Sequence, residues 1–122
     1  MPDLTADWPW GIKGTHLTQD DVRRYLSAPL VILLGDRDID PKAPSFSRGK
    51  TIDKQGITRL ARGVYFFNHA QSTAEKLDTP FAWQIRTIPG APHGGPLVHA
   101  AAIKILIEEM NATRSTLKKN EN

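Results

Sequence analysis

Two loops of this 122-residue chain carry the side chains whose chemistry stands out. The first loop holds three carboxylates at alternate positions, Asp36, Asp38 and Asp40, directly after the apolar run Leu-Val-Ile-Leu-Leu-Gly at 30–35. The second loop holds His93 within a turn rich in Pro and Gly. An imidazole beside a carboxylate makes up the base and the orienting acid of a nucleophilic triad, because the carboxylate fixes the tautomer and the imidazole takes the proton of the nucleophile. If the two loops meet, they supply half of a triad.

The elements predicted around these loops bring them together. The unbroken apolar run at 30–34 is typical of a strand covered on both faces, as in a parallel sheet, and a second strand is predicted at 81–88. Apolar residues at steps of three and four predict a helix at 52–77, although Gly56 and Gly63 each weaken it by about 1 kcal/mol and favour a break at either position. Strand, crossover helix and strand form a parallel pair. Since sites in open α/β sheets form at the carboxyl ends of the strands, we expect the two loops to meet there.

The rest of the chain completes a single α/β domain over 1–122. Residues 1–14 are rich in Trp, Pro and Gly and are predicted to be an irregular lead-in. A helix is predicted at 18–26, because its first residue is a threonine that suits the N-cap position. A last helix is expected at 96–110, with a polar tail at 112–122. Two parallel strands leave sheet edges open, which indicates that neighbouring strands are missing from this chain.

Other interpretations of the polar residues stay open on spacing alone. Aspartates after a strand are common turn formers, and the three carboxylates are spaced as in a calcium loop but lack the flanking helices and the closing Glu. Arg59 and Arg62 are interpreted as cations on the surface of a helix and not as a phosphate clamp. His16, His69 and His99 share no ligand spacing, so we expect no metal site.

A resemblance to the α/β-hydrolases selects among these interpretations. Residues 30–41 resemble the acid-bearing strand and loop of that family, in which Gly-x-x-Asp follows the penultimate strand, and this match places the acid at Asp38. Ile-Pro-Gly-Ala-Pro-His at 88–93 resembles the end of the last strand, where the triad histidine lies, and this match selects His93. The resemblance implies that Asp38 orients His93 as the general base in the cleavage of an ester or similar acyl bond.

The resemblance extends over about residues 8–110 and implies a partial α/β-hydrolase fold. Gln-Gly-Ile-Thr-Arg-Leu-Ala-Arg-Gly at 55–63 and the pair Phe66-Phe67 are similar to a bacterial subgroup of unassigned substrate. The chain also departs from the family pattern: it has no Gly-x-Ser-x-Gly elbow and no oxyanion loop. Pro92 and Gly94 flank the histidine where the family more often has Gly and a polar residue.

Composition excludes several other classes of function. There is no cysteine, so disulfides, thiolate metal sites and cysteine nucleophiles are ruled out, and a reducing, cytoplasmic location is expected. The net charge of +3 comes partly from the lysines of the tail, so we expect no nucleic-acid binding. No run approaches the roughly 20 apolar residues of a membrane span, and the first ten residues do not resemble a signal peptide. No cofactor is expected.

Two functions therefore compete. The first is a C-terminal hydrolase segment whose N-terminal half, with the nucleophile and the oxyanion hole, lies outside this chain; alone it is expected to be inert, and only the completed enzyme would take a small-molecule ester substrate. The second is a non-catalytic protein that buries its open sheet against a second copy of itself, as a homo-oligomer. A nearby coding sequence for a Gly-x-Ser-x-Gly segment would favour the first function.

Overall fold

The computed structural model describes residues 5, 7 and 11–120, with the backbone alone from 118 to 120. Most of the lead-in predicted at 1–14 therefore lies outside the described residues. The elements follow in the predicted order and confirm an α/β architecture: helix α1 (Gln19–Ser27), strand β1 (Leu30–Gly35), a 3-10 turn (Ile52–Gln55), helix α2 (Arg59–Lys76), strand β2 (Trp83–Ile88) and helix α3 (Pro96–Asn120).

Three predicted boundaries need correction. The helix predicted at 52–77 is broken at Gly56, whose φ of 130° is incompatible with a helix; α2 begins afresh after the N-cap Thr58, whose hydroxyl accepts from the N–H of Ala61. The strand predicted from 81 begins at Trp83, because the N–H of Ala82 donates to the end of α1. The tail predicted at 112–122 is helical as far as Asn120, since no Gly or Pro follows Pro96.

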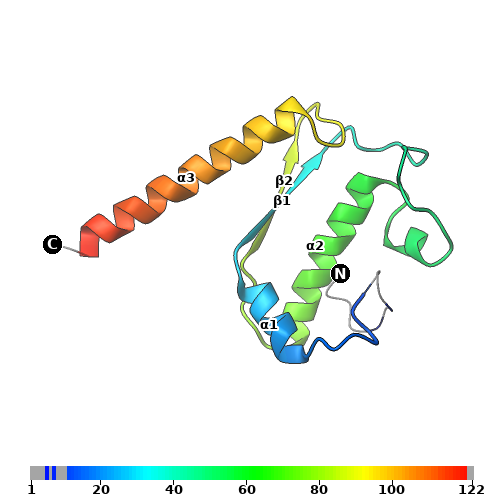
Figure 1. Ribbon diagram of the computed structural model, residues 1–122, viewed down its shortest axis with the longest axis horizontal. Coiled ribbons are helices and arrows are strands. Elements are labelled where there is room, and N and C mark those ends of the chain that lie inside the picture. The colour runs from blue at the N-terminus through cyan, green and yellow to red at the C-terminus, as the bar shows by residue number, and fades with distance from the viewer. Residues whose placement is uncertain (1–4, 6, 8–10, 121–122) are drawn as a thin grey trace.

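The sheet consists of β1 and β2, which are parallel and in register from Leu30 opposite Trp83 to Gly35 opposite Ile88. Leu30 and Ile32 pack on the core beneath α2, and Leu34 meets Gly63 of the same helix. Val31 and Leu33 face α3. Helices thus lie on both faces of the sheet (Figure 1), which is why the β1 sequence is apolar without alternation.

The core lies at the amino ends of the strands, opposite to the loops of interest. Its buried members come from α1, α2 and β2: Val22, Leu26, Ala70, Ala74 and Trp83. The indole N–H of Trp83 donates to the carbonyl oxygen of Tyr25 (3.1 Å), which satisfies the polar atom of a side chain only 5% exposed. This packing anchors the strands at one end and fixes where their carboxyl ends emerge.

Helix α3 begins beside the carboxyl ends of the strands and then diverges from the sheet (Figure 1). Ile105 is buried, at 8% exposure, but six large apolar residues of the same helix are exposed: Leu97, Ile103, Leu106, Ile107, Met110 and Leu117. Within the described part of the chain, no helix combines the length and the apolar character needed to cross a bilayer.

Candidate active site

The two loops that follow the strands are joined by backbone hydrogen bonds. The N–H of Asp36 donates to the carbonyl oxygen of Ile88 (3.2 Å), which continues the sheet ladder by one step. The N–H of Arg37 then donates to the carbonyl oxygen of Ala91 (2.9 Å). The carboxyl ends of β1 and β2 therefore leave the sheet as one connected unit.

Two residues of the first loop allow this close approach. A Cβ atom on Gly35 would lie 2.2 Å from the carbonyl oxygen of Ala91 and 2.4 Å from that of Pro92, so only glycine fits between the loops. Asp36 supports the second loop from its side chain, because its Oδ1 accepts from the N–H of Gly90 (2.8 Å). Gly35 and the side chain of Asp36 therefore hold the two loops side by side.

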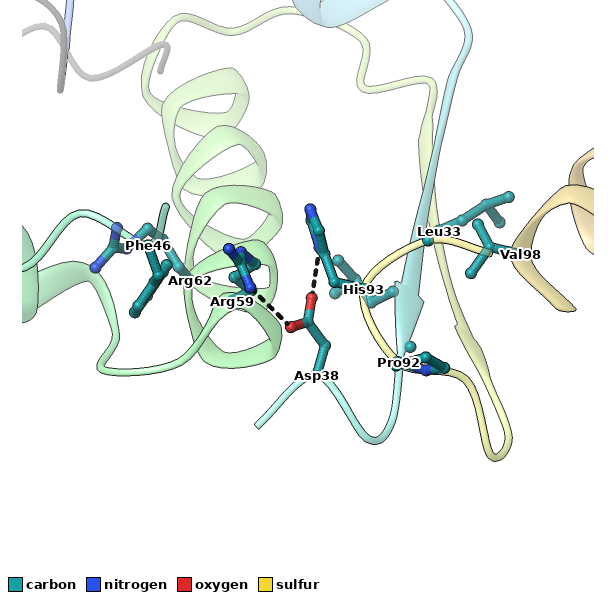
Figure 2. A pocket seen from close by; sticks show the side chains of 11 residues that line it. Leu33, Asp38, Phe46, Arg59, Arg62, Pro92, His93 and Val98 are labelled. Carbon is teal, nitrogen blue, oxygen red and sulfur yellow. Dashed lines mark hydrogen bonds and ion pairs between the residues drawn. The ribbon is translucent and has the colours of Figure 1, made fainter. Parts of the chain in front are cut away.

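Asp38 and His93 meet on these loops (Figure 2). His93 Nδ1 lies 2.7 Å from Asp38 Oδ2. The Asp38 side chain is 11% exposed, whereas that of His93 is 67% exposed. A carboxylate only accepts hydrogen bonds, so Nδ1 donates to it, and a neutral ring would then carry its lone pair on Nε2. This is the geometry in which a carboxylate can orient an imidazole.

The other carboxylates of the loop have different partners. Asp36 binds Gly90, as described above, and the Oδ1 of the exposed Asp40 accepts from the N–H of Lys42 (2.8 Å). Of the three aspartates that the spacing left open, Asp38 is thus the one that faces His93. Among the described residues, no three His, Cys, Asp or Glu side chains gather where they could hold a metal ion.

The interpretation of Arg59 and Arg62 as helix-surface cations was wrong. Their side chains are only 19% and 17% exposed. Arg59 Nη1 lies 3.6 Å from Asp38 Oδ1, and its Nη2 donates to the carbonyl oxygen of Pro44. A signal was available in the sequence: cations in the first turn of a helix oppose the helix dipole, so two of them there imply specific local partners.

Arg62 supports the same loop by other contacts. Its guanidinium lies over the ring of Phe46, 4.1 Å from the centroid, and donates to the carbonyl oxygens of Ser47 (3.1 Å) and Gly56 (3.0 Å). Burial lowers the pKa of this guanidinium below its usual value, and the nearby Asp53 carboxylate opposes that shift. Arg62 therefore holds a wall of the site in place.

A cavity of about 360 Å³ opens beside the pair (Figure 2). Besides Asp38, His93 and the two arginines, its lining is apolar or glycine: Leu33, Leu34, Gly35, Phe46, Pro92, Gly94 and Val98. The volume is near the lower end for small-molecule pockets. No described residue of the lining is Ser, Thr or Cys.

Comparisons with known proteins add two structural neighbours. No protein-family model matches the chain, and no curated protein matches it significantly. Poly(aspartic acid) hydrolase-1 from Sphingomonas sp. KT-1 is similar with a TM-score of 0.81 and 34% identity, over 85% of this chain and 39% of that one. LpqC, a poly(3-hydroxybutyrate) depolymerase from Bordetella parapertussis, is similar with a TM-score of 0.71 and 33% identity, over 76% of this chain and 31% of that one. The chain thus spans well under half the length of either neighbour.

Proposed function

Because the chain belongs to the α/β-hydrolases, we propose that it is a C-terminal segment of their fold and that Asp38 and His93 are the acid and the base of a Ser-His-Asp triad. The observation that carries the proposal is the 2.7 Å contact between His93 Nδ1 and Asp38 Oδ2. The open cavity that His93 lines supports it, since a base needs space for the substrate beside it.

The chemistry proposed for the complete enzyme is acyl transfer. A serine hydroxyl from a segment outside this sequence attacks the acyl carbon, and His93 Nε2 takes the hydroxyl proton. His93 then gives that proton to the leaving alcohol or amine, and a water molecule repeats the cycle to release the acid. Asp38 holds the imidazole in place and stabilises its positive charge while the proton resides there.

The substrate proposed is an ester or a related acyl bond. The two structural neighbours are a hydrolase of poly(aspartic acid) and a depolymerase of poly(3-hydroxybutyrate). Both names describe the cleavage of a polymer built from acyl units, which supports a substrate of that class for this chain as well. The cavity accommodates one small acyl group beside His93.

A chimera tests this function. The segment of poly(aspartic acid) hydrolase-1 that matches this chain is replaced by the chain itself, so that the host supplies the missing strands and the nucleophile. We expect the chimera to hydrolyse short acyl esters, and Asp38→Asn to lower kcat by about 10⁴-fold because the histidine then adopts the wrong tautomer. Asp40→Asn is the matched control, since Asp40 is an exposed carboxylate of the same loop that accepts from the backbone N–H of Lys42 and not from His93. A folded chimera whose turnover survives both Asp38→Asn and His93→Ala would refute the assignment.

The chain alone is expected to show no esterase activity, because the described lining of its cavity contains no hydroxyl or thiol for His93 to activate. The measurement is turnover of short acyl esters by the purified chain, with His93→Ala as the background. Turnover that His93→Ala abolishes would contradict the expectation and would direct attention to Ser45 and Ser47 on the neighbouring loop.

A second function, self-association without catalysis, is favoured by the exposed apolar surface. In the described residues, β1 pairs only with β2, and its other edge has no strand beside it. Ile103, Leu106 and Ile107 on α3 are each more than half exposed. A second copy related by a twofold axis would join the two β1 edges into a four-stranded sheet. Sedimentation at micromolar concentration should then show a dimer, and a cooperatively folding monomer would exclude this function.

A further inference from the structure

We propose that Arg59 is a positioning residue for the Asp38–His93 pair: its guanidinium lies at ion-pair distance from the carboxylate oxygen that the histidine does not contact, and so restricts the rotation of the carboxylate. The inference rests on the proposed function, because it concerns the geometry of the same pair. Arg59 belongs to helix α2 and not to either strand-end loop, so this role would give α2 a part in holding the site.

The carboxylate of Asp38 is held on both of its oxygens (Figure 2). Oδ2 lies 2.7 Å from His93 Nδ1, and Oδ1 lies 3.6 Å from Arg59 Nη1. The last side-chain torsion of an aspartate is broad, so an unsupported carboxylate can turn away from the orientation that favours the hydrogen bond to its neighbour. A cation on one side removes that freedom. Because the side chains of Asp38 and Arg59 are 11% and 19% exposed, little water competes for these contacts.

Arg59 is itself fixed at both ends. Its backbone is the first residue of α2, directly after the N-cap Thr58. Its guanidinium also donates to the carbonyl oxygen of Pro44, and the next residue, Leu60, donates its N–H to the carbonyl oxygen of Asp38 (3.1 Å). The start of α2 thus contacts both the backbone and the side chain of Asp38. An arginine at this end of a helix is disfavoured by the helix dipole, and the nearby carboxylate offsets that cost.

Arg62 offers a comparison within the same molecule. It lies three residues further along α2, lines the same cavity, and binds the same loop through the carbonyl oxygen of Ser47 (3.1 Å). Its carboxylate partner is Asp53, at 3.9 Å, and not Asp38. Removing Arg62 therefore weakens the support of the loop without touching the oxygens of Asp38. This difference separates a positioning role from general support.

The expected consequence concerns the tautomer of His93. While Oδ2 faces the ring, it accepts the Nδ1 proton and leaves Nε2 unprotonated, as a base requires. Without Arg59, the carboxylate can turn or bind water through either oxygen, and the hydrogen bond to Nδ1 is occupied for less of the time. The proton then resides more often on Nε2, which is the tautomer that cannot accept a proton from a nucleophile.

The test uses the ring ¹⁵N chemical shifts of His93 in the full chain, at about pH 9, where a histidine side chain is ordinarily neutral. His93→Gln identifies the signals among those of the four histidines. We expect Arg59→Gln to lower the ratio of the Nδ1–H to the Nε2–H tautomer about two- to fivefold, as for the loss of one partly shielded ion pair. Arg59→Lys should restore part of the ratio, and Arg62→Gln should leave it unchanged.

The controls distinguish failure of this inference from failure of the proposed function. If Asp38→Asn does not shift the ratio, the Asp38–His93 pair is absent in solution and the proposed function fails. If Asp38→Asn shifts the ratio but Arg59→Gln does not, the pair stands and the role of Arg59 is overturned. An equal shift in Arg62→Gln would also overturn it, because the effect would then come from the loop. Circular dichroism checks that each variant is folded, and Arg59→Met, of similar volume, replaces Arg59→Gln if the latter unfolds.

Discussion

Gly35→Ala should damage stability and site geometry together. Gly35 ends β1 at the point where the two strand-end loops cross. An added Cβ would lie 2.2 Å from the carbonyl oxygen of Ala91, whereas real contacts of this kind are at least 3.0 Å. The carbonyl would have to retreat by about 0.8 Å, and the neighbouring carbonyl of Pro92, at 2.4 Å, would have to move with it. Both belong to backbone, so no side-chain rotation relieves the overlap.

The magnitude follows from that overlap. Forcing an extra carbon into a packed region costs about 1–3 kcal/mol. At roughly 4 °C per kcal/mol for a chain of this size, the melting temperature should fall by about 4–12 °C. The displaced segment leads directly into His93, so the 2.7 Å contact with Asp38 should lengthen or break. Thermal unfolding followed by circular dichroism gives the first quantity, and the His93 ring ¹⁵N shifts give the second.

Gly63→Ala is the matched control, because it adds the same methyl group against a different neighbour. Its Cβ would lie 2.4 Å from a methyl carbon of Leu34, which belongs to a side chain that can rotate. Alanine also improves the helix by about 1 kcal/mol relative to glycine. The net change should therefore stay within about 1 kcal/mol. If Gly35→Ala lowers the melting temperature no more than Gly63→Ala does, the close approach of the two loops is not as described.

Further predictions concern the core and helix α1. Leu26→Ala should lower the free energy of unfolding by about 2–5 kcal/mol, because this side chain is fully buried. Leu106→Ala, at a position 63% exposed, should change the free energy of unfolding by less than about 0.5 kcal/mol. Equal losses in the two variants would show that α3 is covered in solution. Hydrogen bonds from the Thr18 hydroxyl and backbone N–H, with Arg24, lower the pKa of Asp21 from 3.8 to about 2. A carboxyl with a lowered folded-state pKa contributes stability that is present above pH 3.8 and is lost as the pH falls towards about 2. Asp21→Asn should therefore flatten the acid side of the stability profile, and an unchanged slope in that window would contradict the assigned contacts.

The sequence predicted the sheet and the meeting of the two loops because both depend on local patterns. The uninterrupted apolar run of β1 implies cover on both faces, and α2 and α3 provide it. A parallel strand pair places both carboxyl ends at one edge, so the loops that bear Asp38 and His93 had to come close. Which aspartate faces the histidine was decided by resemblance, since three carboxylates at alternate positions fit the spacing equally.

The position of the arginines could not be predicted in the same way. Their burial depends on the path of the loop between β1 and α2, which returns so that Pro44 and Ser47 reach the start of the helix. No periodicity encodes such a path, because it is fixed by contacts between residues that are distant in sequence. The sequence did not predict the helical extension to Asn120 for a simpler reason: the segment is polar, although it contains no Gly or Pro that would end a helix.

The parallel pairing of β1 and β2 has a consequence for how the molecule folds. Leu30 lies opposite Trp83, 53 residues further along the chain, and every other pair in the sheet has the same separation. No hairpin can therefore start the sheet, and the entire crossover must collapse before the first strand pair gains stability. We expect α1 and α2 to acquire helical structure early, and the contact between Asp38 and His93, 55 residues apart, to appear only when the chain closes. A refolding signal from His93 would then appear later than the signal from helix content, because the Asp38–His93 contact forms only when the two strands pair.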